Sequence, residues 1–392
     1  MPGPMTNDKR VNQRAPVFLW LGLRILTVLT AILAYVYENG GWGGKSLRML
    51  LTEPWYRYDT FYYLRIVSAG YQAGDVTSGF HPLHPWLSTL AAAVLGSPIA
   101  GLMFVSTIAG LSLTIVFYKL ARLDLDHDRA WTATALMLCW PVTAAIFVPY
   151  TEALYLFLAV SCLLVARRRR FLLAGIIGAL AALTRQHGIL LVLPLTWELW
   201  EASGHKLKTL LGTWKAWVSA ALVPLGYATW ILYRAVAIND FNADFSSAQR
   251  FVYSVMVSPT AYHVYSDQQF ILPWSAVWKA IVAYWNGGLH LSAYNDALLA
   301  AIFITTFIFG WRHLRPSYRI YCLAVLLIAL SYHTGTKINP YVSLPRHMLP
   351  AFPIFVGMAQ AYRFRRLPFV LGVLIVCQML YICCFVWQTW VL

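Results

Sequence analysis

Long apolar runs alternate along the chain with short polar segments that carry most of the charged residues. A helix of about 20 apolar residues is long enough to cross the hydrocarbon core of a bilayer. The pattern therefore predicts an all-α polytopic membrane protein with about 11 transmembrane helices, forming a single transmembrane domain over residues 1–392. The expected spans are residues 16–37, 98–120, 129–147, 153–166, 171–183, 189–200, 214–238, 291–311, 320–332, 346–362 and 367–390.

The first two predicted spans are separated by a long segment, residues 38–97. It contains an amphipathic stretch near residues 46–56 and an apolar stretch, residues 86–95, that is too short to cross, so we expect both to be interfacial helices. If residues 86–95 crossed, the four arginines at 167–170 would lie outside, against the positive-inside rule. We therefore expect a cytoplasmic N-terminus, with residues 38–97 and a second large segment, 239–290, on the outer face.

Composition agrees with this interpretation. Of the 392 residues 59% are hydrophobic and 11% are charged, whereas a soluble domain carries roughly 25% charged residues. The net charge of +15 does not indicate a nucleic-acid partner, because the basic residues lie mostly in short loops between apolar runs. All six cysteines fall inside apolar runs, so we expect neither disulfides nor a metal cluster.

The segment after the first span carries an acid among aromatic rings. Residues 55–65 read W-Y-R-Y-D-T-F-Y-Y-L-R, which places Asp59 next to Tyr58 and between Arg57 and Arg65. A carboxylate in a partly dry aromatic site can act as a general base, and nearby arginines can hold an anion. An aromatic belt at the membrane interface would have the same composition, so this stretch alone leaves both interpretations open.

The predicted topology gathers further ionisable residues on the same outer face. Such residues near membrane depth are costly and usually functional. Acids together with arginines and histidines suit a reaction in which a phosphate leaves and a hydroxyl attacks, because the carboxylate takes the proton and the bases offset the phosphate charge. The candidates are Arg57, Asp59, Arg65, His81, His84, Glu152, Arg185, His187, Lys337, Arg346 and His347.

Several candidates also have simpler explanations. His81 and His84 have a spacing that zinc ligands can have, but no cysteine or third histidine lies nearby in the sequence, so we expect no metal. Glu152 could cap a helix that begins in P-Y-T-E. Arg185 could pair with a lipid headgroup, and Arg346 could be an ordinary base at the start of a span.

Five short motifs, taken in order, resemble those of the PIG-V-like mannosyltransferases, the second GPI mannosyltransferase family. The motifs are R-Y-D-T-F-Y-Y-L-R-I-V-S-A-G-Y from residue 57, F-H-P-L-H-P from 80, P-Y-T-E-A-L-Y-L-F-L from 149, A-A-L-T-R-Q-H-G-I-L-L from 181 and L-P-R-H-M-L-P-A-F-P from 344. Each is weak alone, and the ordered set is specific. Tyr58 stands where the family has Trp, and His81, His84 and His187 replace Phe, Tyr and Asn. The chain is also shorter than eukaryotic members and resembles compact prokaryotic relatives.

This resemblance implies a glycosyltransferase of the GT-C superfamily that moves a sugar, usually mannose, from a polyprenyl-phosphate donor to a hydroxyl of a lipid-linked or glycan acceptor, without a metal or other cofactor. It implies that Asp59 is the general base and that the anomeric configuration inverts. We expect donor phosphate contacts from Arg57, His81, His84, Arg185, Arg346 and His347. We expect the sugar or acceptor to be positioned by Tyr58, Tyr150, Glu152 and His187. The expected location is the outer, periplasmic face of a prokaryotic plasma membrane, or the lumenal face of the endoplasmic reticulum. Two alternatives stay open: a transferase for another lipid-phosphate sugar, and a lipid transporter without catalysis.

Overall fold

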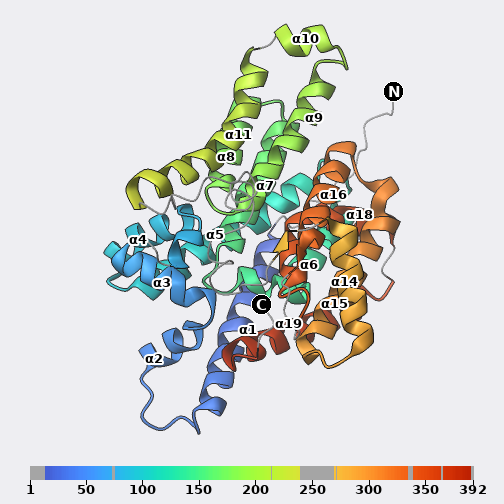
Figure 1. Ribbon diagram of the computed structural model, residues 1–392. Coiled ribbons are helices and arrows are strands. Elements are labelled where there is room, and N and C mark those ends of the chain that lie inside the picture. Colours follow the sequence, from blue (N-terminus) through green and yellow to red (C-terminus); the bar gives the residue numbers. More distant parts are fainter. Residues whose placement is uncertain are drawn as a thin grey trace.

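The structure is a computed structural model that describes residues 14–72, 76–212, 214–238, 269–270, 272–333, 339–362 and 365–389. These residues form a bundle of helices (Figure 1). Five helical segments are long and apolar enough to cross a membrane, which confirms an all-α polytopic membrane protein. They are α1 (Ala15–Glu38), α5 (Pro98–Ala121), α11 (Trp214–Tyr233) continued by the π-helical η5 (Arg234–Ile238), α15 (Leu291–Gly310) continued by the 3-10 helix η6 (Trp311–His313), and α19 (Leu367–Val386).

The other helices in the described part of the chain are shorter. Those at expected spans are α6 (His127–Cys139), α7 (Glu152–Arg167), α8 (Phe171–Ala182), α9 (Val192–Ala202), α16 (Pro316–Ser331), α17 (Leu344–Met348) and α18 (Ile354–Ala361). The rest are α2 (Leu47–Thr52), α3 (Asp59–Ala69), α4 (Leu83–Leu95), α10 (Leu207–Gly212) and α14 (Pro273–Asn286). Helix α4 is about 20 Å long at 1.5 Å per residue, too short for a hydrocarbon core of roughly 30 Å.

Short irregular elements join these helices. They are the 3-10 helices η1 (Glu53–Trp55), η2 (Val76–Gly79), η3 (Pro141–Ile146), η4 (Gln186–Leu191) and η7 (Leu349–Ala351), and the strands β1 (Gln269–Phe270) and β2 (Tyr332–His333). The two strands pair antiparallel, with Gln269 opposite His333. Residues 239–268 of the second expected outer segment, and Lys337, lie outside the described residues.

Three expected spans differ from the structure. Residues 346–362 are not one helix: α17, η7 and α18 follow one another, and Pro345, Pro350 and Pro353 mark the breaks, because proline removes a backbone donor and clashes with the preceding turn. Residues 129–147 are α6 followed by η3, and the span expected from residue 189 begins as η4.

Helix α7 is the centre of the bundle and sets its two ends. It is buried on nearly all sides and packs against α5, α8 and α9. Glu152 is its first residue and Arg167 its last, about 22 Å apart at 1.5 Å per residue. The polar groups near Glu152 and those near Arg167 therefore lie at opposite ends of α7.

Two glycines allow the close packing that positions the segment after α8. A Cβ at Gly175 would overlap the backbone of Ser219 on α11, so α8 and α11 can approach closely only because Gly175 has no side chain. A Cβ at Gly188 would overlap the backbone of Ala181 and Ala182. This glycine therefore lets η4 fold back against the end of α8, which places Arg185 in the turn between them.

Candidate active site

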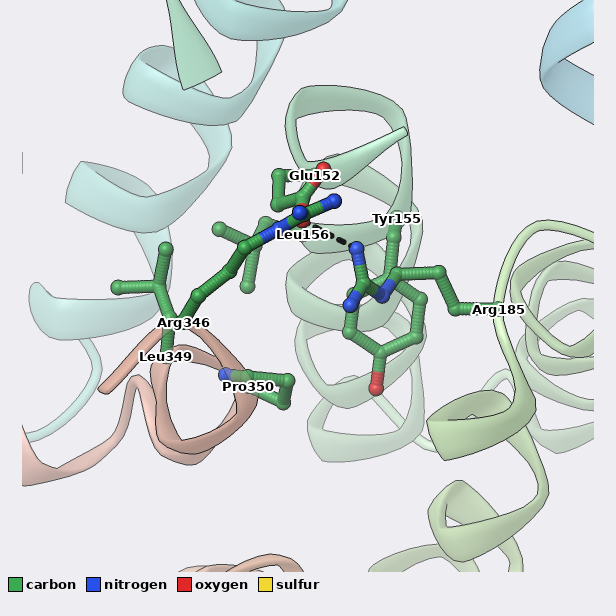
Figure 2. Close-up of a pocket in the computed structure, with 7 residues that line it drawn as sticks. All are labelled: Glu152, Tyr155, Leu156, Arg185, Arg346, Leu349 and Pro350. Atoms are coloured by element: carbon green, nitrogen blue, oxygen red, sulfur yellow. Dashed lines mark hydrogen bonds and ion pairs between the residues drawn. The ribbon is translucent and has the colours of Figure 1, made fainter. Parts of the chain in front are cut away.

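Two arginines converge on one carboxylate at the N-terminus of α7. Glu152 has only 4% of its side chain exposed, and its Oε1 accepts hydrogen bonds from Nη1 of Arg185 and from Nε of Arg346. Figure 2 shows the two guanidinium groups reaching Glu152 from separate segments of the chain. A carboxylate so enclosed by two cations holds them a fixed distance apart.

Arg346 also reaches the acid of the aromatic stretch. Its Nη2 donates to Oδ2 of Asp59 over 2.6 Å, so one guanidinium bridges the first residue of α3 and the first residue of α7. Asp59 has 28% of its side chain exposed, against 4% for Glu152. Of the two acids in this cluster, Asp59 is therefore the one that an incoming molecule can reach.

Strained backbone precedes both partners of this pair. Tyr58, directly before Asp59, has φ +46°, and Ser343, three residues before Arg346, has φ +55°. A positive φ at a residue other than glycine costs of order 1–3 kcal/mol and persists only where the surroundings impose it. The surrounding fold therefore fixes the start of α3 and the start of α17, which carry Asp59 and Arg346.

Aromatic rings and hydroxyls surround the four charged groups. The Arg346 guanidinium carbon lies 4.5 Å from the ring centroid of Tyr150, a cation–π contact. The Tyr150 hydroxyl is buried and has no hydrogen-bond partner within the described part of the chain. Thr151 accepts hydrogen bonds of 3.3 Å from the Tyr63 hydroxyl and from Arg185. Tyr58, expected to position the sugar, packs its ring against Phe385.

His81 braces the segment before Arg185. Its Nδ1 lies 2.9 Å from the carbonyl oxygen of Ala182, and a carbonyl can only accept, so Nδ1 carries the proton. Burial lowers the pKa of His81 to about 3, which leaves the ring neutral near pH 7. Two residues on, the amide of Leu83 donates to the carbonyl of Leu183. The expected contact of His81 with phosphate finds no support in this geometry.

His84 braces the segment before Glu152 in the same manner. It is fully buried, and its Nε2 lies 3.1 Å from the hydroxyl of Ser106, which donates in turn to the carbonyl of Tyr150. Because the Ser106 hydrogen is used there, Nε2 of His84 is the donor to Ser106. The motif at residues 80–85 thus ties the start of α7 and the end of α8 together. The expected contact of His84 with phosphate stays a prediction.

Two further histidines link the arginine-bearing segments. The rings of His187 and His347 stack with centroids 6.1 Å apart. His187 follows Arg185 by two residues and His347 follows Arg346 by one, so the stack packs η4 against α17. His187 is 3% exposed, and its Nδ1 has no hydrogen-bond partner among the described residues.

Arg57 does not join the cluster. Its Nη2 pairs with Glu38 at the end of α1 over 3.1 Å, and its Nε donates to the carbonyl of Val386 at the end of α19 over 2.7 Å. These bonds use the guanidinium to fasten the chain just before Asp59 to two helix ends. Arg57 thus lies outside the ionic cluster, and its expected contact with the donor phosphate stays a prediction.

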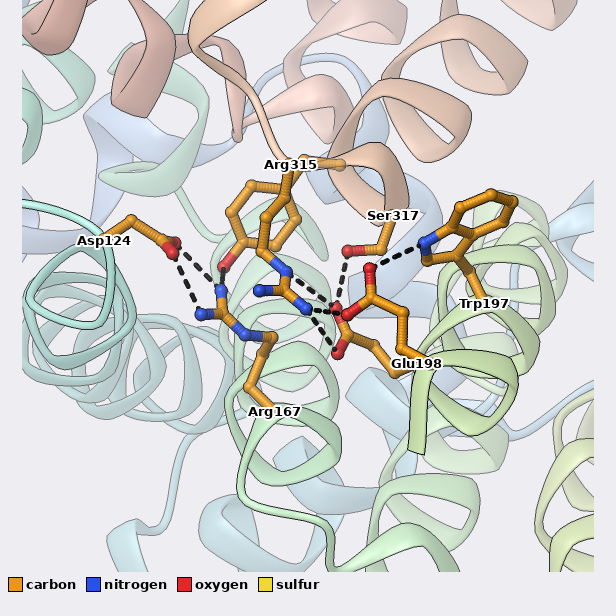
Figure 3. A network of polar contacts seen from close by, with 8 residues as sticks. Asp124, Arg167, Trp197, Glu198, Arg315 and Ser317 are labelled. Carbon is orange, nitrogen blue, oxygen red and sulfur yellow. Dashed lines mark hydrogen bonds and ion pairs between the residues drawn. The ribbon is translucent and has the colours of Figure 1, made fainter. Parts of the chain in front are cut away.

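The opposite end of the bundle holds a separate set of ion pairs (Figure 3). Arg167 forms two 2.9 Å hydrogen bonds with Asp124 and a third with the Tyr318 hydroxyl. Arg315 bridges Glu198 and Glu201. These pairs connect α7, α9 and the start of α16. Arg167 is thus used in structural contacts and lies outside the candidate site.

A small pocket opens between the two arginines. It is narrow and is lined by Glu152, Tyr155, Leu156, Arg185, Arg346, Leu349 and Pro350. The described contacts engage Nη1 of Arg185 and both Nε and Nη2 of Arg346. Other N–H groups of both guanidiniums are left to bind an anion. The pocket therefore brings together two guanidinium groups and the Glu152 carboxylate that binds both of them.

Some residues of the site escaped the sequence analysis. Tyr63 and Thr151 lie inside motifs that were singled out, but nothing in their residue type marks them. Asp296 is a buried acid on α15, and its position within an apolar run was a usable signal, because acids at membrane depth are usually functional. Ser343 carried no signal, since its left-handed backbone appears only in the fold.

Comparisons with known proteins add a partial family match. The sequence profile of the family described as dolichyl-phosphate-mannose-protein mannosyltransferase matches residues 79–233. This part contains Glu152 and Arg185 and leaves out Asp59 and Arg346. The family differs from the PIG-V-like one that the motifs resemble, and that closer assignment stays a prediction. No curated protein matches the chain.

Two solved structures are similar at low identity. One is the archaeal oligosaccharyltransferase AglB from Archaeoglobus fulgidus in complex with an inhibitory peptide and a dolichol-phosphate, with 14% identity over 94% of this chain and a TM-score of 0.47. The other is the apo form of the Archaeoglobus fulgidus oligosaccharyltransferase, with 15% identity over 95% of this chain and a TM-score of 0.47. The match covers 55% of each of those chains, so this chain spans about half their length. The family match supports a membrane enzyme of the glycosyltransferase type.

Proposed function

We propose that the protein is a glycosyltransferase that moves a sugar from a polyprenyl-phosphate donor to a hydroxyl of a lipid-linked or glycan acceptor, and that this sugar is mannose. The observation that carries the proposal is the convergence of Asp59, Glu152, Arg185 and Arg346, from four separate segments, into one ionic cluster. The partial match to dolichyl-phosphate-mannose-protein mannosyltransferases supports the donor class.

The two acids differ in exposure, and this difference divides their roles. Asp59 is partly exposed and bound by one arginine, whereas Glu152 is enclosed by two. Asp59 is therefore the general base, because a base must come within hydrogen-bond reach of the acceptor hydroxyl. Glu152 positions the arginines and is not the base.

The phosphate of the donor binds at the pocket between Arg185 and Arg346. Its lining includes both guanidinium groups and leaves out Asp59. We therefore assign the pocket to the phosphate alone, with the sugar toward Asp59 and the lipid chain outside it. Arginine suits this position because its planar fork matches phosphate oxygens.

The reaction is one displacement at the anomeric carbon. The acceptor oxygen forms a bond to that carbon while the bond from the carbon to the phosphate oxygen breaks. The acceptor proton goes to Asp59, and the electron pair of the broken bond stays with the polyprenyl phosphate. The leaving phosphate gains one negative charge, which the two guanidinium groups stabilise. Attack opposite the phosphate inverts the anomeric configuration.

The test is direct identification of the product. Purified protein in nanodiscs is incubated with radiolabelled polyprenyl-phosphate mannose and a lipid extract of its host, beside parallel reactions with labelled glucose and arabinose donors. The expected result is a labelled lipid or glycan from the mannose donor with inverted configuration.

Two results would change the proposal. Transfer from the glucose or arabinose donor alone would keep the mechanism and replace the sugar. Absence of transfer from every donor, with a correctly folded protein that moves labelled lipid between leaflets, would favour a transporter instead.

A further inference from the structure

A buried acid on α15 touches the segment that carries Arg346. Asp296 is 2% exposed, and its Oδ2 accepts hydrogen bonds of 3.2 Å from the side-chain amide of Asn339 and from the backbone amide of Ser343. Among the described residues no cation pairs with it. A buried acid in an apolar helix that forms no ion pair is costly to keep. Both of its hydrogen-bond partners lie within residues 339–343.

The backbone contact falls on the strained residue at the start of α17. Ser343 has φ +55° and ψ +31°, a left-handed conformation that disfavours every residue with a side chain. Its carbonyl accepts from the amides of Arg346 and His347 over 3.0 and 3.2 Å. The chain of contacts thus runs from the carboxylate to the Ser343 amide, and from the Ser343 carbonyl to the first turn of the helix that presents Arg346.

Asn339 strengthens the same corner. Its side-chain oxygen accepts from the amide of Tyr341 over 2.9 Å while its nitrogen donates to Asp296. All three polar residues of the corner, Asp296, Asn339 and Ser343, are less than 10% exposed. In such a dry setting a hydrogen bond is stronger than the same bond in water.

We infer that Asp296 is a positioning residue, which holds Ser343 in its left-handed conformation and so aims Arg346 at Asp59 and Glu152. This inference rests on the proposed function for its effect on sugar transfer, but not for its effect on the structure of α17. Asp296 touches neither the arginine side chain nor the pocket, so it acts only through the backbone.

Four variants separate this role from general stability. Asp296→Ala removes both hydrogen bonds. Asp296→Asn is the conservative rescue, because both bonds reach one oxygen and an amide oxygen can accept both. Asn295→Ala is the matched control: Asn295 is the neighbouring residue and donates to the Tyr381 hydroxyl on α19, so its loss breaks a contact between helices that does not involve α17. Asp296→Ala with Ser343→Gly tests the mechanism, since glycine adopts a left-handed backbone without strain.

The first measurement is hydrogen–deuterium exchange of residues 340–350 in nanodiscs. Asp296→Ala should speed exchange of this segment about twofold to tenfold, as expected for losing an ordinary hydrogen bond. Asp296→Asn and Asn295→Ala should stay near the wild type, and adding Ser343→Gly should restore part of the protection. If Asp296→Ala does not fold, Ser343→Val should unprotect the same segment, because a β-branched residue is strained at this φ. Unchanged exchange in Asp296→Ala, or in Ser343→Val where that variant is needed, would overturn the inference whether or not the protein transfers sugar.

The second measurement is a double-mutant cycle on transfer. Asp296→Ala should lower kcat/KM in the wild-type background. In an Arg346→Ala background it should lower kcat/KM by less than about threefold more, because the effects of residues that act through one another are not additive. An equal loss in both backgrounds would show that Asp296 does not act through Arg346. A wild type without transfer would refute the proposed function, and the exchange measurement would still decide the positioning role.

Discussion

Arg346 donates a hydrogen bond of 2.6 Å to Asp59, although 287 residues separate the two along the chain. The same guanidinium binds Glu152 through a different nitrogen. One planar group thus joins two acids from two helices, and the pocket lies beside it. The geometry of the candidate site depends on this bridge more than on any other single contact.

Replacing Arg346 by lysine should therefore impair the site even though the charge is kept. An ammonium group is a single point that cannot span both carboxylates as the guanidinium fork does. We expect Arg346→Lys to weaken the binding of polyprenyl phosphate about tenfold to a hundredfold, the loss expected for one to two hydrogen bonds to a charged group. Calorimetric titration of the lipid phosphate into protein in nanodiscs measures this.

The chain offers a matched control for that variant. Arg315 also bridges two acids, Glu198 and Glu201, at the other end of the bundle (Figure 3). Arg315→Lys should leave the affinity for polyprenyl phosphate within about twofold of the wild type. Equal losses in both variants would mean that the affinity reports stability, not a phosphate site.

The bracing position of His81 predicts a pH effect on stability. Burial lowers its pKa to about 3, so in the unfolded chain, with an ordinary pKa near 6.5, the ring takes up a proton first as the pH falls. The contribution of the neutral His81 ring to the free energy of unfolding is therefore complete above about pH 6.5 and is lost as the pH falls toward 3. At pH 5 the loss is at most about 2 kcal/mol, at 1.36 kcal/mol per pKa unit.

His81→Gln should reduce this pH dependence, because glutamine can still donate to Ala182 but does not titrate. The fall in melting temperature from pH 7 to pH 5, measured in detergent, should therefore be smaller for His81→Gln than for the wild type. His205→Gln, at an exposed turn between α9 and α10, should keep the wild-type difference. A His81→Gln protein with the full wild-type fall would show that this ring is not a neutral brace.

Breaking the ion pair between Arg167 and Asp124 should lower the stability of the protein without changing its affinity for polyprenyl phosphate. Asp124→Asn removes the charge partner of Arg167, whose side chain is only 10% exposed, and leaving a buried charge unpaired costs about 3–5 kcal/mol. We expect a lower melting temperature and an unchanged affinity for polyprenyl phosphate per folded molecule. A loss of affinity with an unchanged melting temperature would contradict the separation of the two ends.

The apolar pattern predicts much of the fold because each segment that crosses a membrane must itself be apolar and long enough, whatever it packs against. Helices α1, α5 and α19 begin and end within a few residues of the expected spans. The breaks at Pro345, Pro350 and Pro353 were visible in the sequence, but whether a proline kinks a span or ends it depends on the neighbours that take up the freed backbone groups.

The candidate site could be predicted only in part, for a related reason. Residue type and the expected side of the membrane suffice to select Asp59, Glu152, Arg185 and Arg346 as a group. Which atom each side chain touches depends on packing between distant segments. His81, His84 and Arg57 were expected at the phosphate. In the structure His81 bonds the Ala182 carbonyl, His84 the Ser106 hydroxyl and Arg57 the Val386 carbonyl at the end of α19.

The most direct test of the account compares sugar transfer and lipid-phosphate binding in Asp59→Asn. Asparagine keeps the shape of the side chain and cannot accept the proton, so transfer should fall by about 10²–10⁴-fold, the range for losing a general base, while polyprenyl phosphate still binds. Glu53→Gln, an acid in the same segment, should transfer at the wild-type rate. Transfer by Asp59→Asn within about twofold of the wild type would contradict the central claim that this carboxylate takes the proton.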